Sequence, residues 1–109
     1  MILPPFKAAV EEGAASVMNS FNDVNGIPAT GDEYLQRTQL KENWEFDGFV
    51  VSDWGSMREM TAHGYAPDLK TATEMAIEAG SDMDMESEGY QQYLQDLVQL
   101  GQVDISLVN

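Results

Sequence analysis

The chain contains no cysteine among its 109 residues, so disulfide bonds and thiolate metal sites are excluded. Basic residues are also scarce: 5 lysines and arginines stand against 19 acids, for a formal net charge of -14. Such an acidic surface repels phosphate backbones, so we expect no nucleic-acid partner, whereas a neutral sugar is compatible with it. No apolar run approaches the roughly 20 residues that span a bilayer, so we expect no membrane partner. The first residues also lack the pattern of a signal peptide.

Apolar periodicity and turn residues predict helices alternating with strands along the chain. Helices are expected over 4–13, 32–44, 69–79 and 90–98, strands over 14–21, 48–52 and 81–85, and loops over 22–31 and 56–67, the second with a helical turn. This order favours a parallel sheet with crossover helices. Three strands are too few for a barrel, which needs eight in roughly 250 residues. Both ends also interrupt an element, so the chain is either a small α/β domain or a piece of a larger fold.

The run from Gly48 to Gly55 is the most informative stretch, because an uninterrupted apolar strand ends in the carboxylate of Asp53. Parallel α/β folds place their chemistry at this end of a strand. As a nucleophile, an ionised carboxylate there could attack the anomeric carbon of a sugar. Alternatively, Asp53 caps a helix that starts near Ser56, since aspartate is a preferred N-cap. Composition and position leave both interpretations open.

Three apolar residues near Asp53 have two interpretations each. Trp54 could stack on a sugar ring or pack in the core. Met18 and Phe21, at the end of the preceding strand, could line the same pocket or belong to the core. The sequence alone does not separate these alternatives.

Other polar residues give weaker indications of chemistry. Asp82 and Asp84 share one face of their strand, but no third ligand is apparent and His63 is the only histidine, so we predict no metal site. His63 is expected in a loop near the rim. Neither Ser20 nor Ser52 stands in the G-x-S-x-G pattern of serine hydrolases, and no phosphate-binding or dinucleotide motif occurs.

Three ordered blocks carry a resemblance to a known family: V-M-N-S-F-N-D-V-N-G-I-P-A-T (17–30), W-E-F-D-G-F-V-V-S-D-W-G (44–55) and A-G-S-D-M-D-M (79–85). Together they resemble glycoside hydrolase family 3, in particular bacterial periplasmic β-glucosidases. The resemblance implies an α/β fold in which residues 1–109 form an incomplete portion, about strands six to eight, of the N-terminal (β/α)8 TIM-type barrel domain. It also implies a periplasmic or extracellular location for the full-length protein.

The resemblance assigns roles to single residues. It implies that Asp53 is the nucleophile of a retaining hydrolysis, that Trp54 flanks the aglycone subsite, and that Met18 and Phe21 lie beside the nucleophile. Phe21 stands where fungal relatives usually have tyrosine, so a hydroxyl near the nucleophile is missing. Gln36 and Gln39 stand at usually apolar positions, so their helix is expected to pack less well.

The resemblance also implies what the chain needs. Earlier barrel strands, and a following sandwich domain with the acid/base glutamate, are expected partners outside this sequence. The substrate would be a β-glucoside or oligosaccharide hydrolysed at its terminal non-reducing β-D-glucosyl residue, with a β-xyloside as the alternative. No metal or organic cofactor is required. Two further interpretations remain: a non-catalytic fragment, inactive alone or at most a weak carbohydrate-binding or assembly module, and an unrelated three-layer α/β domain with helices on both faces of its sheet.

Overall fold

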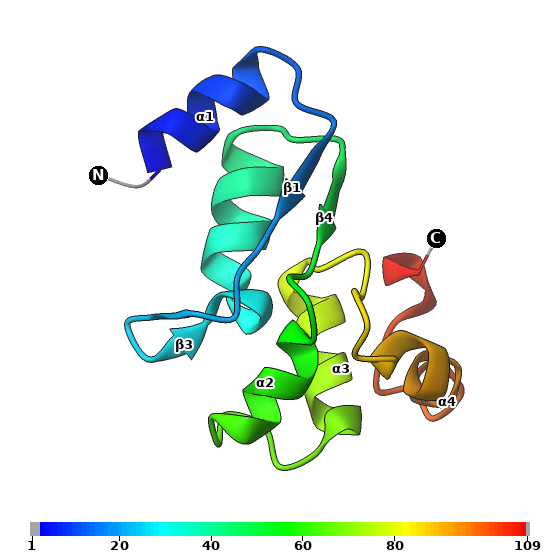
Figure 1. Ribbon diagram of the computed structural model, residues 1–109. Helices are drawn as coiled ribbons and strands as arrows, with labels where there is room; N and C mark the ends of the chain where they lie inside the picture. The colour runs from blue at the N-terminus through cyan, green and yellow to red at the C-terminus, as the bar shows by residue number, and fades with distance from the viewer. Residues whose placement is uncertain (1–2, 109) are drawn as a thin grey trace.

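The computed structural model describes residues 3–108, which form a short parallel sheet with helices packed beside it (Figure 1). Strand β1 (Ser16–Met18) pairs in parallel with β4 (Phe49–Val51), with Met18 opposite Val51. On the other side of β4, Val51 forms a single parallel bridge with Met83. The expected parallel order is therefore confirmed, but the strand expected over 81–85 is reduced to one bridge.

The strand expected over 81–85 is short because side chains take the place of its backbone hydrogen-bond partners. The Met85 N–H donates to the Ser52 hydroxyl at 2.9 Å instead of to a backbone carbonyl. The Asp82 carboxylate accepts the Val50 N–H at 2.8 Å, so a side chain also satisfies this donor of β4. Strand β1 is likewise shorter than the expected 14–21, because the chain leaves the sheet at Asn19.

The helices follow the expected order, with one addition. They are α1 (Leu3–Glu11), η2 (Tyr34–Asn43), α2 (Ser56–Ala62), α3 (Leu69–Ala79), and the continuous pair η3 (Tyr90–Leu94) and α4 (Gln95–Gln99), with short 3-10 turns η1 (Ala29–Gly31) and η4 (Ile105–Leu107). The prediction of a loop with one helical turn over 56–67 was wrong at α2. That helix forms because Met57 and Met60, three positions apart, are fully buried against α3.

A small hairpin occupies the loop expected over 22–31. Strands β2 (Asp23–Val24) and β3 (Ile27–Pro28) pair antiparallel across Asn25 and Gly26. Both turn residues have positive φ, 53° and 82°, as a two-residue type I′ turn requires.

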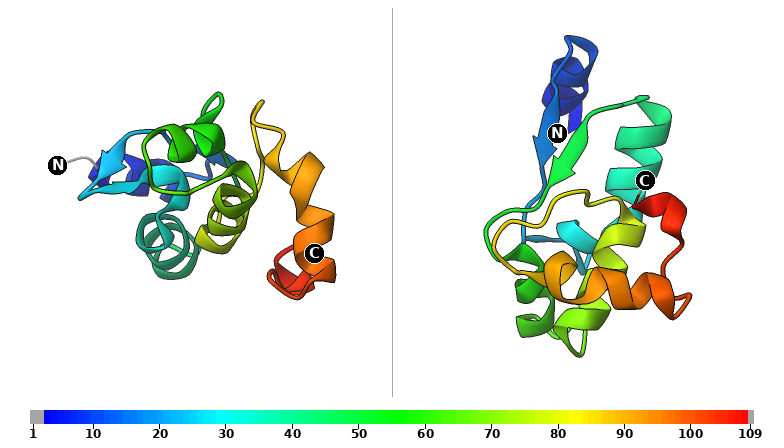
Figure 2. Two further views of the ribbon diagram at one scale, coloured as in Figure 1. Left: turned by 90° about the horizontal axis from the view of Figure 1, so that it is seen from below. Right: turned by 90° about the vertical axis from the view of Figure 1, so that its right-hand side faces the viewer.

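Helices η2 and α1 lie against one face of the sheet, and no helix covers the other face within residues 3–108 (Figure 2). On the covered side, fully buried Val50 packs with Leu40 and Phe46, and half-buried Val17 joins them. On the open side, Met18, Phe49 and Met83 each keep about half of their surface accessible, at 53%, 46% and 52%. Within residues 3–108 the sheet therefore lacks the second helical layer that a three-layer domain would have. Nor is any helix in this range long and apolar enough to cross a bilayer.

Candidate active site

Asp53 lies where β4 ends and the chain turns into α2. Its side chain is partly buried, and its Oδ1 accepts the Trp54 N–H at 2.7 Å. The preceding residue, Ser52, is completely buried and anchors the end of the strand to Met83 through a 2.8 Å backbone hydrogen bond. The carboxylate is therefore held at the C-terminal end of a parallel strand, the end at which such folds place reactive groups.

The alternative that Asp53 caps a helix is wrong. The N-cap of α2 is Gly55, whose φ of 65° needs the conformational freedom of glycine, and the side chain that accepts an N–H of the first turn is Ser87, whose hydroxyl binds the Arg58 N–H at 3.2 Å. The Asp53 backbone carbonyl accepts the Ser56 N–H at 3.0 Å, but the carboxylate takes no part in the helix terminus. It is therefore available for another role.

The apolar residues predicted around Asp53 surround the strand ends and do not pack in the core. Trp54 is 68% exposed and follows Asp53 directly. Met18, 53% exposed, is the last residue of β1. It pairs with Val51, which lies two residues before Asp53. Phe21, 41% exposed, comes three residues after β1. Within residues 3–108 none of the three packs in the core, and their contact with a sugar stays a prediction.

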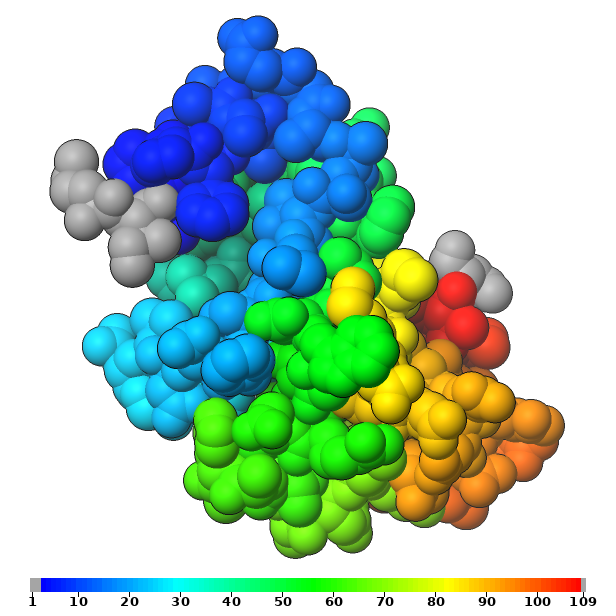
Figure 3. Space-filling model, viewed as in Figure 1, coloured from blue at the N-terminus to red at the C-terminus, as the bar shows by residue number. Residues whose placement is uncertain are grey.

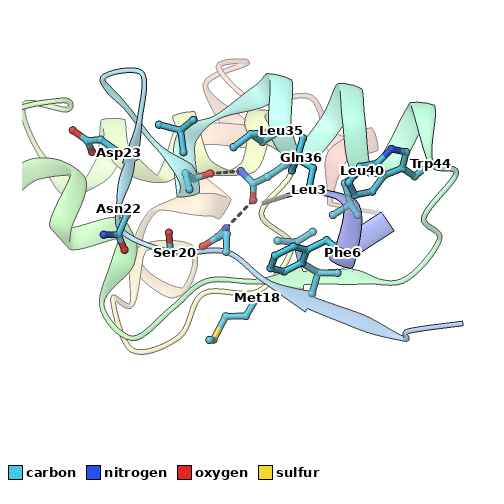
Figure 4. A pocket seen from close by; sticks show the side chains of 15 residues that line it. Leu3, Phe6, Met18, Ser20, Asn22, Asp23, Leu35, Gln36, Leu40 and Trp44 are labelled. Atoms are coloured by element: carbon cyan, nitrogen blue, oxygen red, sulfur yellow. Dashed lines mark hydrogen bonds between the residues drawn. The ribbon is translucent and has the colours of Figure 1, made fainter. Parts of the chain in front are cut away.

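A buried polar network beneath these strand ends was not predicted from the sequence. Gln36 Oε1 accepts an N–H of Asn19 at 2.7 Å, and Gln36 Nε2 donates to the Ala29 and Thr30 carbonyls at 2.9 and 3.0 Å (Figure 4). The network joins the end of β1, η1, η2, α2 and the segment after α3 through the side chains of Asn19, Thr30, Gln36, Ser56 and Ser81. The expectation that Gln36 weakens its helix was therefore wrong, because its amide is buried with partners.

Helix η2 is wound more widely than an ordinary α-helix. It is a π-helix, closed for example by the Trp44 N–H bonded to the Gln39 carbonyl five residues earlier at 2.9 Å. Its two buried residues, Gln36 and Leu40, face the network and the sheet. The Asp32 carboxylate supports its start by accepting the Leu35 N–H at 3.1 Å.

The most apolar cavity lies apart from Asp53. It measures about 470 Å³ and is hollowed between α1, the hairpin and η2, as the space-filling view shows (Figure 3). Leu3, Phe6 and Leu40 line it, whereas Asp53 and Trp54 do not. Met18 reaches its border, but its side chain extends to the other side of β1 from Leu40 (Figure 4). This cavity therefore does not enlarge the candidate site.

The paired carboxylates after α3 have structural partners. Asp82 forms an ion pair with Lys41 at 2.7 Å, and Asp84 accepts the N–H groups of Ser87 and Gly89 at 3.2 and 2.6 Å. Burial, then the charges of Asp84 and Asp82, raise the pKa of Tyr90, so its phenol stays protonated and donates to the Ser81 carbonyl. Within residues 3–108, no group of three histidine or acidic side chains is arranged to hold a metal ion.

His63 lies in the turn after α2, beside the hairpin. It follows the last residue of α2 and approaches Asp23 of β2 at 3.8 Å and Glu59 at 3.4 Å. These contacts link α2 to the hairpin and do not involve Asp53.

Comparisons with known proteins agree with this architecture. The family profile of the glycosyl hydrolase family 3 N-terminal domain matches residues 1–109. A periplasmic β-glucosidase of Salmonella typhimurium is 40% identical over 95% of the chain, and a probable exo-1,4-β-xylosidase of Aspergillus terreus is 38% identical over 90%. The chain spans only 14% and 13% of the length of these two relatives.

A solved structure gives the same result in three dimensions. The crystal structure of a β-glucosidase from Listeria innocua superposes with a TM-score of 0.94 at 40% identity, covering 97% of this chain and 15% of that one. The same enzyme has been solved with glucose and, as a mutant, with laminaribiose. The parallel βα units described above are therefore part of a TIM-barrel-type α/β fold, and the chain belongs to glycosyl hydrolase family 3.

Proposed function

We propose that Asp53 is the nucleophile of a retaining β-glucosidase of which this chain forms part. The observation that carries the proposal is the carboxylate at the end of β4, which caps no helix and is oriented by the Trp54 N–H at 2.7 Å. Exposed Trp54 and Met18 flank it with apolar surface on which a sugar ring can pack. Asp82 and Asp84, the paired carboxylates after α3, are instead engaged by Lys41 and by backbone N–H groups.

In this mechanism an Asp53 oxygen bonds to the anomeric carbon while the bond from that carbon to the aglycone oxygen breaks. The departing oxygen takes a proton from a general acid, which we place outside this chain. Water, deprotonated by the same group, then attacks the anomeric carbon and releases Asp53 as a carboxylate. Neither step requires a cofactor.

The rest of the proposal concerns the larger protein. Residues 1–109 form about strands six to eight of its barrel, as a partial N-terminal domain, and earlier strands and a following sandwich domain complete the pocket. The family relatives, which are several times longer than this chain, support this arrangement. The Salmonella relative, a periplasmic β-glucosidase, supports a periplasmic or extracellular location.

The test is kinetic and uses the L. innocua enzyme in which this chain replaces the matching segment. The chimera should hydrolyse 4-nitrophenyl β-glucoside, and Asp53→Gly should reduce turnover by at least about a thousandfold, or roughly 4 kcal/mol of barrier. Asp47→Asn, which changes an exposed acid just before the same strand, is the matched control. Turnover of Asp53→Gly within about tenfold of the parent chimera, roughly 1.4 kcal/mol, would exclude Asp53 as the nucleophile.

A β-xyloside is the alternative substrate, because several relatives are named β-xylosidases. Comparing kcat/KM for 4-nitrophenyl β-glucoside and β-xyloside in the same chimera tests it. A ratio above one favours the glucosidase and a ratio below one the xylosidase.

A further inference from the structure

The residue before Asp53 carries a set of hydrogen bonds that the catalytic proposal does not use. Ser52 is completely buried, although serine is mostly found at protein surfaces. Its hydroxyl donates to the Asp53 backbone carbonyl at 3.1 Å and accepts the Met85 N–H at 2.9 Å. One side chain therefore connects the backbone of Asp53 to the neighbouring strand segment.

Met85 completes a second link to the same turn. Its carbonyl accepts the Gly55 N–H at 2.9 Å, while its own N–H goes to the Ser52 hydroxyl. Asp53 and Trp54 lie between these two attachment points. Both backbone groups of Met85 thus hold the turn, one at each end.

Of these contacts between the turn and Met85, only the one through the Ser52 hydroxyl comes from a side chain. The Gly55 contact and the Ser56 N–H bonded to the Asp53 carbonyl at 3.0 Å are backbone interactions and survive substitution of Ser52. Removing the hydroxyl would leave the Met85 N–H without its partner and would release one of the two donors on the Asp53 carbonyl. The Asp53 peptide could then rotate, and the carboxylate with it.

We propose that Ser52 is a positioning residue, whose hydroxyl fixes the orientation of the Asp53 carboxylate by binding the turn to Met85. This inference rests on the proposed role of Asp53. A misplacement of about 1 Å at a reacting group can cost on the order of a hundredfold in rate. Because Ser52 is buried beneath the turn, its loss should slow the attack of Asp53 more than it weakens sugar binding.

The experiment compares Ser52→Ala, Ser52→Thr and Ser81→Ala in the chimeric enzyme. Ser81→Ala is the matched control: it removes another completely buried serine hydroxyl, which belongs to the network around Gln36 and makes no contact with Asp53. The probe is a 2-deoxy-2-fluoro-β-glucoside with a good leaving group, which forms a slowly hydrolysed bond to the nucleophile. Its kinetics separate the binding constant from the rate of bond formation.

For Ser52→Ala we expect bond formation at least about tenfold slower than in Ser81→Ala, a binding constant within about threefold, and recovery in Ser52→Thr. A smaller difference from Ser81→Ala, or a loss shared by Ser52→Thr, would overturn the proposal. Asp53→Gly tests the nucleophile separately. Failure of the proposal for Ser52 can therefore be distinguished from failure of the proposal for Asp53.

Hydrogen exchange tests the same contact without activity. Deuterium uptake at the Met85 amide should be faster in Ser52→Ala than in the parent and in Ser81→Ala. Unchanged protection of this amide would contradict the positioning role even if turnover falls.

Discussion

The carboxylate of Asp53 owes its position to short-range contacts. One oxygen accepts the Trp54 N–H, and the backbone carbonyl of the same residue accepts hydrogen bonds from Ser52 and Ser56. A reacting group held this way loses little conformational entropy when a substrate binds, because it is already oriented.

One prediction at this scale concerns Gln36. Substitution by leucine should lower the free energy of unfolding by about 1–3 kcal/mol, because the Ala29 and Thr30 carbonyls and the Asn19 amide lose a buried partner. Gln39→Leu is the control, since Gln39 is only partly buried and contacts the exposed Tyr34 hydroxyl. Thermal unfolding of the chimera measures both, and equal effects would contradict a special role for Gln36.

Single elements show how far the sequence could predict the fold. The helix over Leu69–Ala79 was predicted with its observed bounds, because its apolar spacing and terminal Gly80, with φ of 110°, are local signals. Helix α2 was missed because its stability comes from the burial of Met57 and Met60 against α3, which is a tertiary effect. The network of Gln36 was also unpredictable, because its partners are up to 45 residues away in sequence.

The candidate site, too, could be predicted only in part from the sequence. The end of an apolar strand pointed to Asp53, and Trp54, Met18 and Phe21 are exposed within residues 3–108. The function of Ser52 could not be read from the sequence, because Met85 lies 33 residues further along. An aspartate preceded by a serine carries no signal of that contact.

Strand β4 provides a prediction about backbone packing. A Cβ at Gly48 would lie 2.1 Å from the Ala15 carbonyl oxygen. The backbone segments before β4 and β1 therefore approach too closely for any side chain at residue 48. Gly48→Ala should therefore separate the start of β4 from β1 and destabilise the fold by about 1–3 kcal/mol or more. Exposed Asp47→Ala should change stability by less than about 0.5 kcal/mol. Thermal unfolding of both variants tests this, and an unaffected Gly48→Ala would contradict it.

Helix α3 provides a pH prediction. The Asp68 carboxylate accepts the Thr71 N–H at 2.8 Å, and this hydrogen bond lowers the pKa of Asp68 below its ordinary value of 3.8. The ionised cap therefore stabilises the folded state fully above pH 3.8, and this contribution is lost as pH falls through the lower folded-state pKa. Asp68→Asn keeps a cap that cannot titrate, so its difference in Tm from the parent should shrink in acid. A difference independent of pH would contradict this.

For the whole molecule, the open face of the sheet is the dominant feature. Met18, Phe49 and Met83 expose apolar surface beside strand edges that have no partner within residues 3–108. The isolated chain should therefore self-associate despite its charge of -14, and more strongly near its pI of about 4.1. Phe49→Ser should reduce association, whereas Leu100→Ser, at an exposed site after α4, should not. Sedimentation analysis measures this, and a monodisperse monomer that melts cooperatively would contradict it.

The most direct test of the central claim identifies the residue that bonds to the sugar. The chimera is inactivated with a 2-deoxy-2-fluoro-β-glucoside, digested and examined by tandem mass spectrometry. The proposal predicts one fluoroglucosyl group on Asp53, absent from Asp53→Gly and released by excess acceptor as activity returns. A label on any other residue, or an unlabelled enzyme that still turns over aryl β-glucosides, would contradict it.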